Sequence, residues 1–220
     1  MDEDVRQDLD LIVAATLTLL GLIIGFSFSM ALGRYDQRKN YEEAEANAIG
    51  TEYVRADLLP AADAARVRSL LVGYLDQRIL FYRTRDESTL QLINADTTEL
   101  QTELWSAARA PFGEVPPPIH SLILSGMNDV LNSQGYTQAA WWNRIPLAAW
   151  GLLAAVAVCA NILVGYTARR AGGGVVRLLA LPLVLSISFF LIADIDSPRR
   201  GIILVRPQNL ISLAQSLHGH

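Results

Sequence analysis

Three long runs without charged side chains constrain what this chain can fold into. They cover residues 11–33, 147–168 and 178–193, and a helix needs about 20 consecutive apolar residues to cross a bilayer. The third run reaches that length when residues 175–177 are added, because an arginine at a helix end can extend its charge to the interface. The sequence therefore predicts an all-α membrane protein with three transmembrane helices.

The rest of the composition narrows the class. Hydrophobic residues make up 51% of the chain, and the net charge is -4 with no long basic run, so no nucleic-acid partner is expected. The residues before the first run are acidic and no small-residue cleavage site follows it, which argues against a signal peptide. The single cysteine, Cys159, lies in an apolar run and provides neither a disulfide framework nor a thiolate metal site.

Basic residues near the ends of the runs predict the orientation, because they are enriched on the cytoplasmic side. With the middle of the chain inside, the basic residues divide seven against four. An outside N-terminus and a multi-pass protein of the cell (inner) membrane are therefore predicted. The inner residues are Arg34, Arg38, Lys39, Arg144, Arg199, Arg200 and Arg206, and the outer ones are Arg6, Arg169, Arg170 and Arg177.

Four regions are predicted along the chain. Residues 1–33 form the N-terminal segment and first transmembrane helix, 34–145 a helical cytoplasmic domain, 146–196 two further transmembrane helices and 197–220 a cytoplasmic tail along the domain surface. The first helix is expected to run from residue 9 to residue 59, roughly 75 Å, because only Gly50 interrupts good helix formers before Pro60. Further helices are expected over 61–83, 86–110 and 119–142, the last interrupted near Gly135.

Apolar spacing also predicts which side chains of the middle domain are buried. One stripe follows Pro60, and a second lies on the helix expected over 86–110. The first contains Val67, Leu70, Leu71, Tyr74 and Leu75, and the second contains Leu92, Leu100, Leu104 and Trp105.

Two neighbouring stripes recur every fourth residue in the first run. Small side chains can let helices touch closely in lipid, and the bulkier stripe beside them would then face a shared axis as a hydrophobic constriction, which gates ions by dewetting. The alternative is that both stripes face lipid or pack within the chain. The small residues are Gly21, Gly25, Ser29 and Gly33, and the bulkier stripe is Thr18, Leu22, Phe26 and Met30.

Several segments resemble a known family. The stretch from Ile23 contains Gly-Phe followed at fixed spacing by Arg34-Tyr35, and it is similar to the pore-lining helix of bestrophin channels. The segments GRYDQRK, EANAIGTEYVRADLLP (with Glu45 and Asn47) and DIDSPRRG more closely resemble a bacterial bestrophin-like membrane family over nearly the whole chain.

The resemblance implies a homo-oligomer, a pentamer in bestrophins, with membrane lipid and inorganic ions as its other partners. The neck would be formed by Thr18, Leu22 and Phe26, with Met30 as a possible continuation. Thr18 departs from the apolar type and would make the outer ring wetter.

Four acidic residues are candidates for a cytoplasmic pore or vestibule, because carboxylates in a cleft attract cations. They are Glu45, Glu52, Asp194 and Asp196. For Glu45 and Glu52 the alternative is a solvated helix face with pairs such as Glu52 to Arg55. For Asp196 the alternative is a residue that ends the third span and pairs with a nearby arginine. Calcium gating is not expected, because two carboxylates beside two arginines offer too few oxygens.

No catalytic arrangement accompanies these features. His120, His218 and His220 have no partner at metal-ligand spacing, and the glycines of 171–174, read as a turn, match no phosphate-binding pattern. We therefore expect no enzyme, cofactor or metal. The prediction is an ion channel with unresolved ion selectivity, and the alternative is a non-conducting membrane-anchored scaffold or signalling partner.

Overall fold

The computed structural model describes residues 3–111, 113–170 and 175–218. The side chains of residues 3–6, 169, 170, 175 and 177 are outside this description. The glycine turn at 171–174, His220 and the side chains of Arg6, Arg169, Arg170 and Arg177 therefore lie outside the described residues.

The predicted all-α class is confirmed. Among the described residues, three stretches are long and apolar enough to cross a membrane. They are Gln7–Leu58, Pro117–Ala168 and Leu178–Asp196, which confirms a membrane protein with three candidate spans. The elements are α1 (Glu3–Arg55), the 3-10 helix η1 (Ala56–Leu58), α2 (Ala61–Arg83), α3 (Glu87–Arg109), α4 (Pro117–Trp142), α5 (Leu147–Arg170), α6 (Val175–Asp196) and α7 (Gln208–His218).

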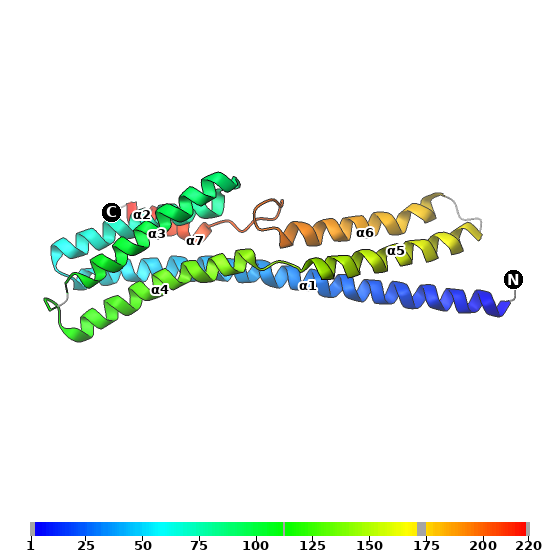
Figure 1. Ribbon diagram of the computed structural model, residues 1–220, viewed down its shortest axis with the longest axis horizontal. Coiled ribbons are helices and arrows are strands. Elements are labelled where there is room, and N and C mark those ends of the chain that lie inside the picture. Colours follow the sequence, from blue (N-terminus) through cyan, green and yellow to red (C-terminus); the bar gives the residue numbers. More distant parts are fainter. Residues whose placement is uncertain (1–2, 112, 171–174, 219–220) are drawn as a thin grey trace. The chain divides into compact units, whose positions relative to one another are not determined.

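The chain divides into two compact units, and α1 contributes to both. Unit 1 consists of Met1–Tyr35 and Asn143–Ile203, and unit 2 consists of Asp36–Trp142 and Leu204–His220. In unit 1 the first part of α1 is accompanied by the neighbouring helices α5 and α6 (Figure 1). Unit 2 contains the rest of α1 with α2, α3, α4 and α7.

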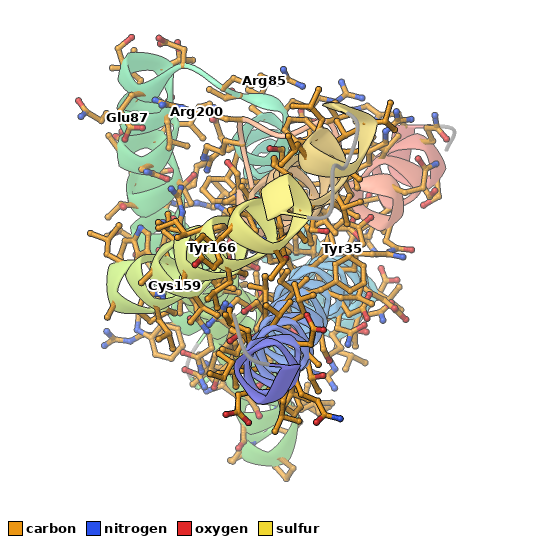
Figure 2. The ribbon with its side chains drawn as sticks, turned by 90° about the vertical axis from the view of Figure 1, so that its right-hand side faces the viewer. Tyr35, Arg85, Glu87, Cys159, Tyr166 and Arg200 are labelled. Atoms are coloured by element: carbon orange, nitrogen blue, oxygen red, sulfur yellow. The ribbon has the colours of Figure 1, made fainter. Side chains whose placement is uncertain are left out.

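Unit 1 is held together by one face of α1. Two apolar clusters join this face to α5 and α6 and to the residues beside them. The first contains Leu20, Ala157, Ala160 and Leu185, and the second contains Ala31, Ile145, Ile192 and Ile195. Cys159 and Tyr166 extend from α5, and both are exposed (Figure 2).

The core of unit 2 confirms most of the predicted stripe on α2. Val67, Leu71, Tyr74 and Leu75 are buried, whereas Leu70 is half-buried. The prediction for Leu92 on α3 is wrong, because this side chain is 67% exposed. The buried face of α3 includes Leu90, Ile93, Thr97 and Leu104. The prediction for Leu104 is therefore confirmed, while Leu100 and Trp105 are half-buried.

The start of α3 follows ordinary capping chemistry. The Asp86 carboxylate accepts a hydrogen bond from the Thr89 backbone N–H at 2.8 Å, as an N-cap residue does. Hydrogen bonds from the Ser88 hydroxyl and then from the Thr89 backbone and hydroxyl lower the pKa of Asp86 to about 2. The capped start lies within one residue of the predicted one.

One feature of unit 2 differs from expectation. The interruption predicted near Gly135 is wrong, since α4 is one helix from Pro117 to Trp142. A glycine in a helix interior is unfavourable by only about 1 kcal/mol, and the buried residues on both sides of Gly135 hold the helix together. In the tail, α7 buries Leu210 completely and places Leu213 against Gly50 of α1.

Candidate pore-lining helix

In unit 1 the two predicted stripes of α1 lie on the face opposite the helical packing. Leu22, Phe26 and Met30 are exposed by 54%, 63% and 46% in the single chain, and Thr18 is exposed as well. The Thr18 hydroxyl donates to the Ala14 carbonyl at 2.8 Å. The hydroxyl hydrogen is therefore bonded within the helix and is not free to donate outward. The exposed surface of Thr18 is for this reason less polar than that of a threonine with a free hydroxyl.

The small stripe is equally open. Gly21, Gly25 and Gly33 have no heavy atom within 4 Å of the position that a Cβ would take, and Ser29 is exposed. Within the described residues, the three glycines therefore face no other helix of the chain. They leave a shallow face on α1 that another helix could approach closely.

At the end of unit 1, Asp196 organises the polar contacts. Its two carboxylate oxygens accept from the Ile145 backbone N–H at 3.2 and 2.9 Å, and Arg34 lies 3.4 Å away. Asp196 is 6% exposed. The alternative in which Asp196 ends the third span and pairs with an arginine is the arrangement that the structure shows.

The Asp194 side chain also bonds to residues of unit 1. Its carboxylate accepts from the backbone N–H groups of Ile202 and Ile203 at 2.6 and 2.8 Å. Gly201 is required here, because a Cβ would lie 2.6 Å from the Asp194 carbonyl oxygen. Both aspartates are thus occupied in shaping the chain after α6, and the structure does not favour them as a charged ring at a pore mouth.

In unit 2 the buried face of α1 is largely charged. The residues recur every three or four positions and so share one side of the helix, and each is at most 2% exposed. They are Arg38, Glu42, Glu45, Ile49 and Glu52. Glu45 and Glu52 therefore belong neither to an open vestibule nor to a solvated face in the single chain.

Glu45 is the centre of this buried network. It pairs with Arg78 of α2 and accepts from the Tyr82 hydroxyl at 3.3 Å and the Thr137 hydroxyl at 3.2 Å. Burial alone would lower the pKa of Arg78, but the adjacent Glu45 carboxylate raises it. The Arg78 guanidinium also lies 4.4 Å from the centre of the Phe81 ring, so Glu45 joins α1, α2 and α4.

Two further charged residues fix other helices. Glu42 accepts from the Leu210 backbone N–H at 3.0 Å and from the Asn209 amide at 2.6 Å, which caps the start of α7. The Arg38 guanidinium donates to the Ala140 carbonyl at 3.1 Å near the end of α4. The carboxylate satisfies free N–H groups and the guanidinium a free carbonyl, as helix ends require.

Glu52 differs from the other buried carboxylates. Neither of its oxygens has a hydrogen-bond partner within the described part of the chain. The Arg55 Nη1 atom lies 3.7 Å from Oε2, which confirms the predicted pair. Burial raises the pKa of Glu52 to about 7, Arg55 opposes the shift and Asp129 of α4 adds to it.

The other residues of the family motif, Arg34, Tyr35 and Asn47, have different surroundings in the structure. Tyr35 packs against the second apolar cluster of unit 1, and Arg34 pairs with Asp196. Asn47 is exposed on α1 and borders a hollow between α1 and α7. The motif therefore combines packing residues with one exposed amide.

Sequence reasoning missed most of this buried network. Glu42, Arg78, Tyr82 and Thr137 were not singled out, and Arg38 was used only for the predicted orientation. The available signal was the three-to-four-residue spacing of Arg38, Glu42, Glu45, Ile49 and Glu52, which marks a single helix face although four of the five are charged.

The histidines are separated from one another. His120 is buried on α4 and His218 ends α7. Within the described residues, no three His, Cys, Asp or Glu side chains come together as metal ligands would.

Comparison with known proteins identifies the family. The bestrophin-like domain matches residues 8–210, and the chain belongs to this family. No curated protein matches the sequence significantly.

Solved structures with the same fold include those of a bacterial Bestrophin homolog from Klebsiella pneumoniae and of its variants. One is 13% identical with a TM-score of 0.73, covering 94% of this chain and 85% of its own. Another is 14% identical with a TM-score of 0.73, covering 97% and 86%. A third is 14% identical with a TM-score of 0.69, covering 94% and 85%. At this level of identity the likeness shows a shared fold.

Proposed function

We propose that the protein is a homo-oligomeric ion channel in which α1 lines the pore. Thr18, Leu22 and Phe26 form the hydrophobic neck, and Met30 continues it. One observation carries the proposal: these side chains are exposed on α1, whereas the opposite face of α1 packs against α5 and α6. Membership of the bestrophin-like family supports the same function.

The small stripe supplies the contact between subunits. Gly21, Gly25, Ser29 and Gly33 allow the α1 helix to approach a neighbouring copy closely, which turns the bulkier stripe toward a common axis. The family resemblance favours five copies, surrounded by membrane lipid. The basic residues favour an outside N-terminus in the inner membrane, with unit 2 and the C-terminus cytoplasmic.

The neck does not select ions by charge. Its side chains are neutral, so they oppose every hydrated ion when the constriction is narrow enough to lose its water. Ion sign is therefore determined outside the neck.

Replacing Phe26 with alanine tests the neck. Phe26→Ala should raise the ion flux several-fold in liposomes, because the truncated side chain widens the constriction and lets water remain in it. Flux is measured with potassium, sodium and chloride gradients, and a sizing column checks that the oligomer is intact.

The matched control is Ile187→Ala on α6, where the side chain is 58% exposed. It should leave the flux unchanged, since it faces lipid in the proposed assembly. Equal flux in wild type and Phe26→Ala would contradict the neck. An intact, correctly inserted oligomer that conducts in neither form would favour the scaffold alternative.

A further inference from the structure

One strip of α1 in unit 2 stays open after the other helices of the unit have packed. Its residues are exposed and follow one another at spacings of three or four, which places them on one helix face. They are Gln37, Asn40, Ala44, Asn47 and Thr51, all uncharged. Arg55 follows four residues later with 30% of its side chain exposed. It is the one charge on this strip.

Two hollows border the Arg55 end of the strip. The larger is about 540 Å³ and lies between α1 and α7, where Asn209 and Ser212 line it. The smaller is about 200 Å³ and includes Gly126 and Asp129 of α4. Asn47, Thr51 and Arg55 line both. The larger hollow thus gathers the Asn47 amide, the Thr51 hydroxyl and the Arg55 guanidinium as donors, which suits a small anion.

Donors in the larger hollow are available for a ligand. The Asn47 amide and the Thr51 hydroxyl make no hydrogen bond with any other described residue. Asp129 borders only the smaller hollow, so its negative charge does not line the larger one.

Glu52 lies behind Arg55 and is confined there. A Cβ on Gly126 would come within 3 Å of both the Glu52 carboxylate and the Arg55 guanidinium, so the pair is pressed against the α4 backbone. The Glu52 carboxylate is fully buried and neither of its oxygens is hydrogen-bonded by a described residue. Within the described residues, the ion pair that balances its charge is the one with Arg55, at 3.7 Å.

We propose that Arg55, with Asn47 and Thr51, forms a binding site for a small inorganic anion that is switched on when Glu52 takes up a proton. With Glu52 ionised, the pair is neutral and the anion is weakly held. With Glu52 protonated, Arg55 loses the carboxylate with which it pairs and presents more positive charge to the larger hollow. That this site also biases permeation toward anions rests on the proposed channel function.

The switch falls in an accessible pH range. Burial raises the pKa of Glu52 to about 7, so Glu52 is ionised at pH 8.5 and protonated at pH 5.5. The charged groups that face it are Arg55 on α1 and Asp129 on α4. Anion binding should therefore strengthen as the pH falls.

Chloride is the probe for this site. In detergent-solubilised full-length protein, the excess ³⁵Cl NMR line width should rise several-fold between pH 8.5 and pH 5.5. Glu52→Gln should give the high value at both pH values, because the neutral amide mimics the protonated acid. Arg55→Gln should lose the excess at both. Arg66→Gln, on the exposed side of α2, is the control and should behave as wild type.

Flux in liposomes under a potassium chloride gradient separates this site from the channel itself. The chloride share of the current should rise at pH 5.5 and should lose its pH dependence in Glu52→Gln. The anion site is overturned, even if the protein conducts, by either of two results. The first is an excess line width that is unchanged in Arg55→Gln, and the second is an excess line width that still depends on pH in Glu52→Gln. If the line widths behave as expected but the liposomes show no ion flux, the anion site is established and the channel function is overturned.

Discussion

Glu45→Leu should lower the free energy of unfolding of unit 2 by about 3–5 kcal/mol, because it leaves the Arg78 guanidinium buried without its carboxylate. The Tyr82 and Thr137 hydroxyls lose an acceptor in the same step. Thermal or chemical unfolding of the detergent-solubilised protein measures the loss. Glu99→Leu on the exposed side of α3 is the matched control and should change stability little.

A second substitution separates the charge from the packing. Glu45→Leu combined with Arg78→Leu removes both ions, and buried pairs replaced by apolar side chains are often neutral in stability. The double variant should therefore recover most of the loss. A double variant as unstable as the sum of the two single ones would contradict the view that the unpaired charge dominates.

Asp196→Ala should destabilise unit 1 by about 2–3 kcal/mol, because a hydrogen bond to a charged acceptor contributes that much and the Ile145 N–H stays buried without it. Arg34 loses its carboxylate as well. The unfolding midpoint in detergent measures the effect.

Asp196→Asn should lose less than the alanine variant, since its amide oxygen still accepts from Ile145. Asp10→Ala on the exposed side of α1 provides the comparison for a carboxylate without such contacts. If Asp196→Ala were as stable as Asp10→Ala, the carboxylate would not be holding the start of α5.

Much of the fold is readable from the sequence because its signals are local. Charge-free runs mark the spans, Pro60 marks the end of the first long helix, and the start expected at residue 86 lies within one residue of the start of α3. Gly135 shows the limit of such reasoning. A glycine weakens a helix only slightly, and whether the helix continues depends on packing that the local sequence does not display.

The buried charges of α1 could not be predicted for a related reason. Glu45 is stabilised by Arg78 and Thr137, which are 33 and 92 positions away. Hydropathy assigns a glutamate to the solvent side, and only the folded unit shows that Glu45 is buried while a neutral strip of the same helix is exposed. By contrast, the neck candidates were predictable as a stripe, because every-fourth-residue spacing is a property of one helix.

The most direct test of the central claim is chemical block of the ion flux from a cysteine placed in the neck. Cys159 is the one cysteine of the sequence, so Cys159→Ala gives a clean background for Phe26→Cys. The control is Ile162→Cys on α5, where the side chain is 65% exposed and faces lipid in the proposed assembly. A charged thiol reagent is added to conducting liposomes, and labelling is verified by mass. We expect block of the flux at position 26 and none at position 162. Complete labelling of position 26 with unchanged flux would contradict a pore lined by α1.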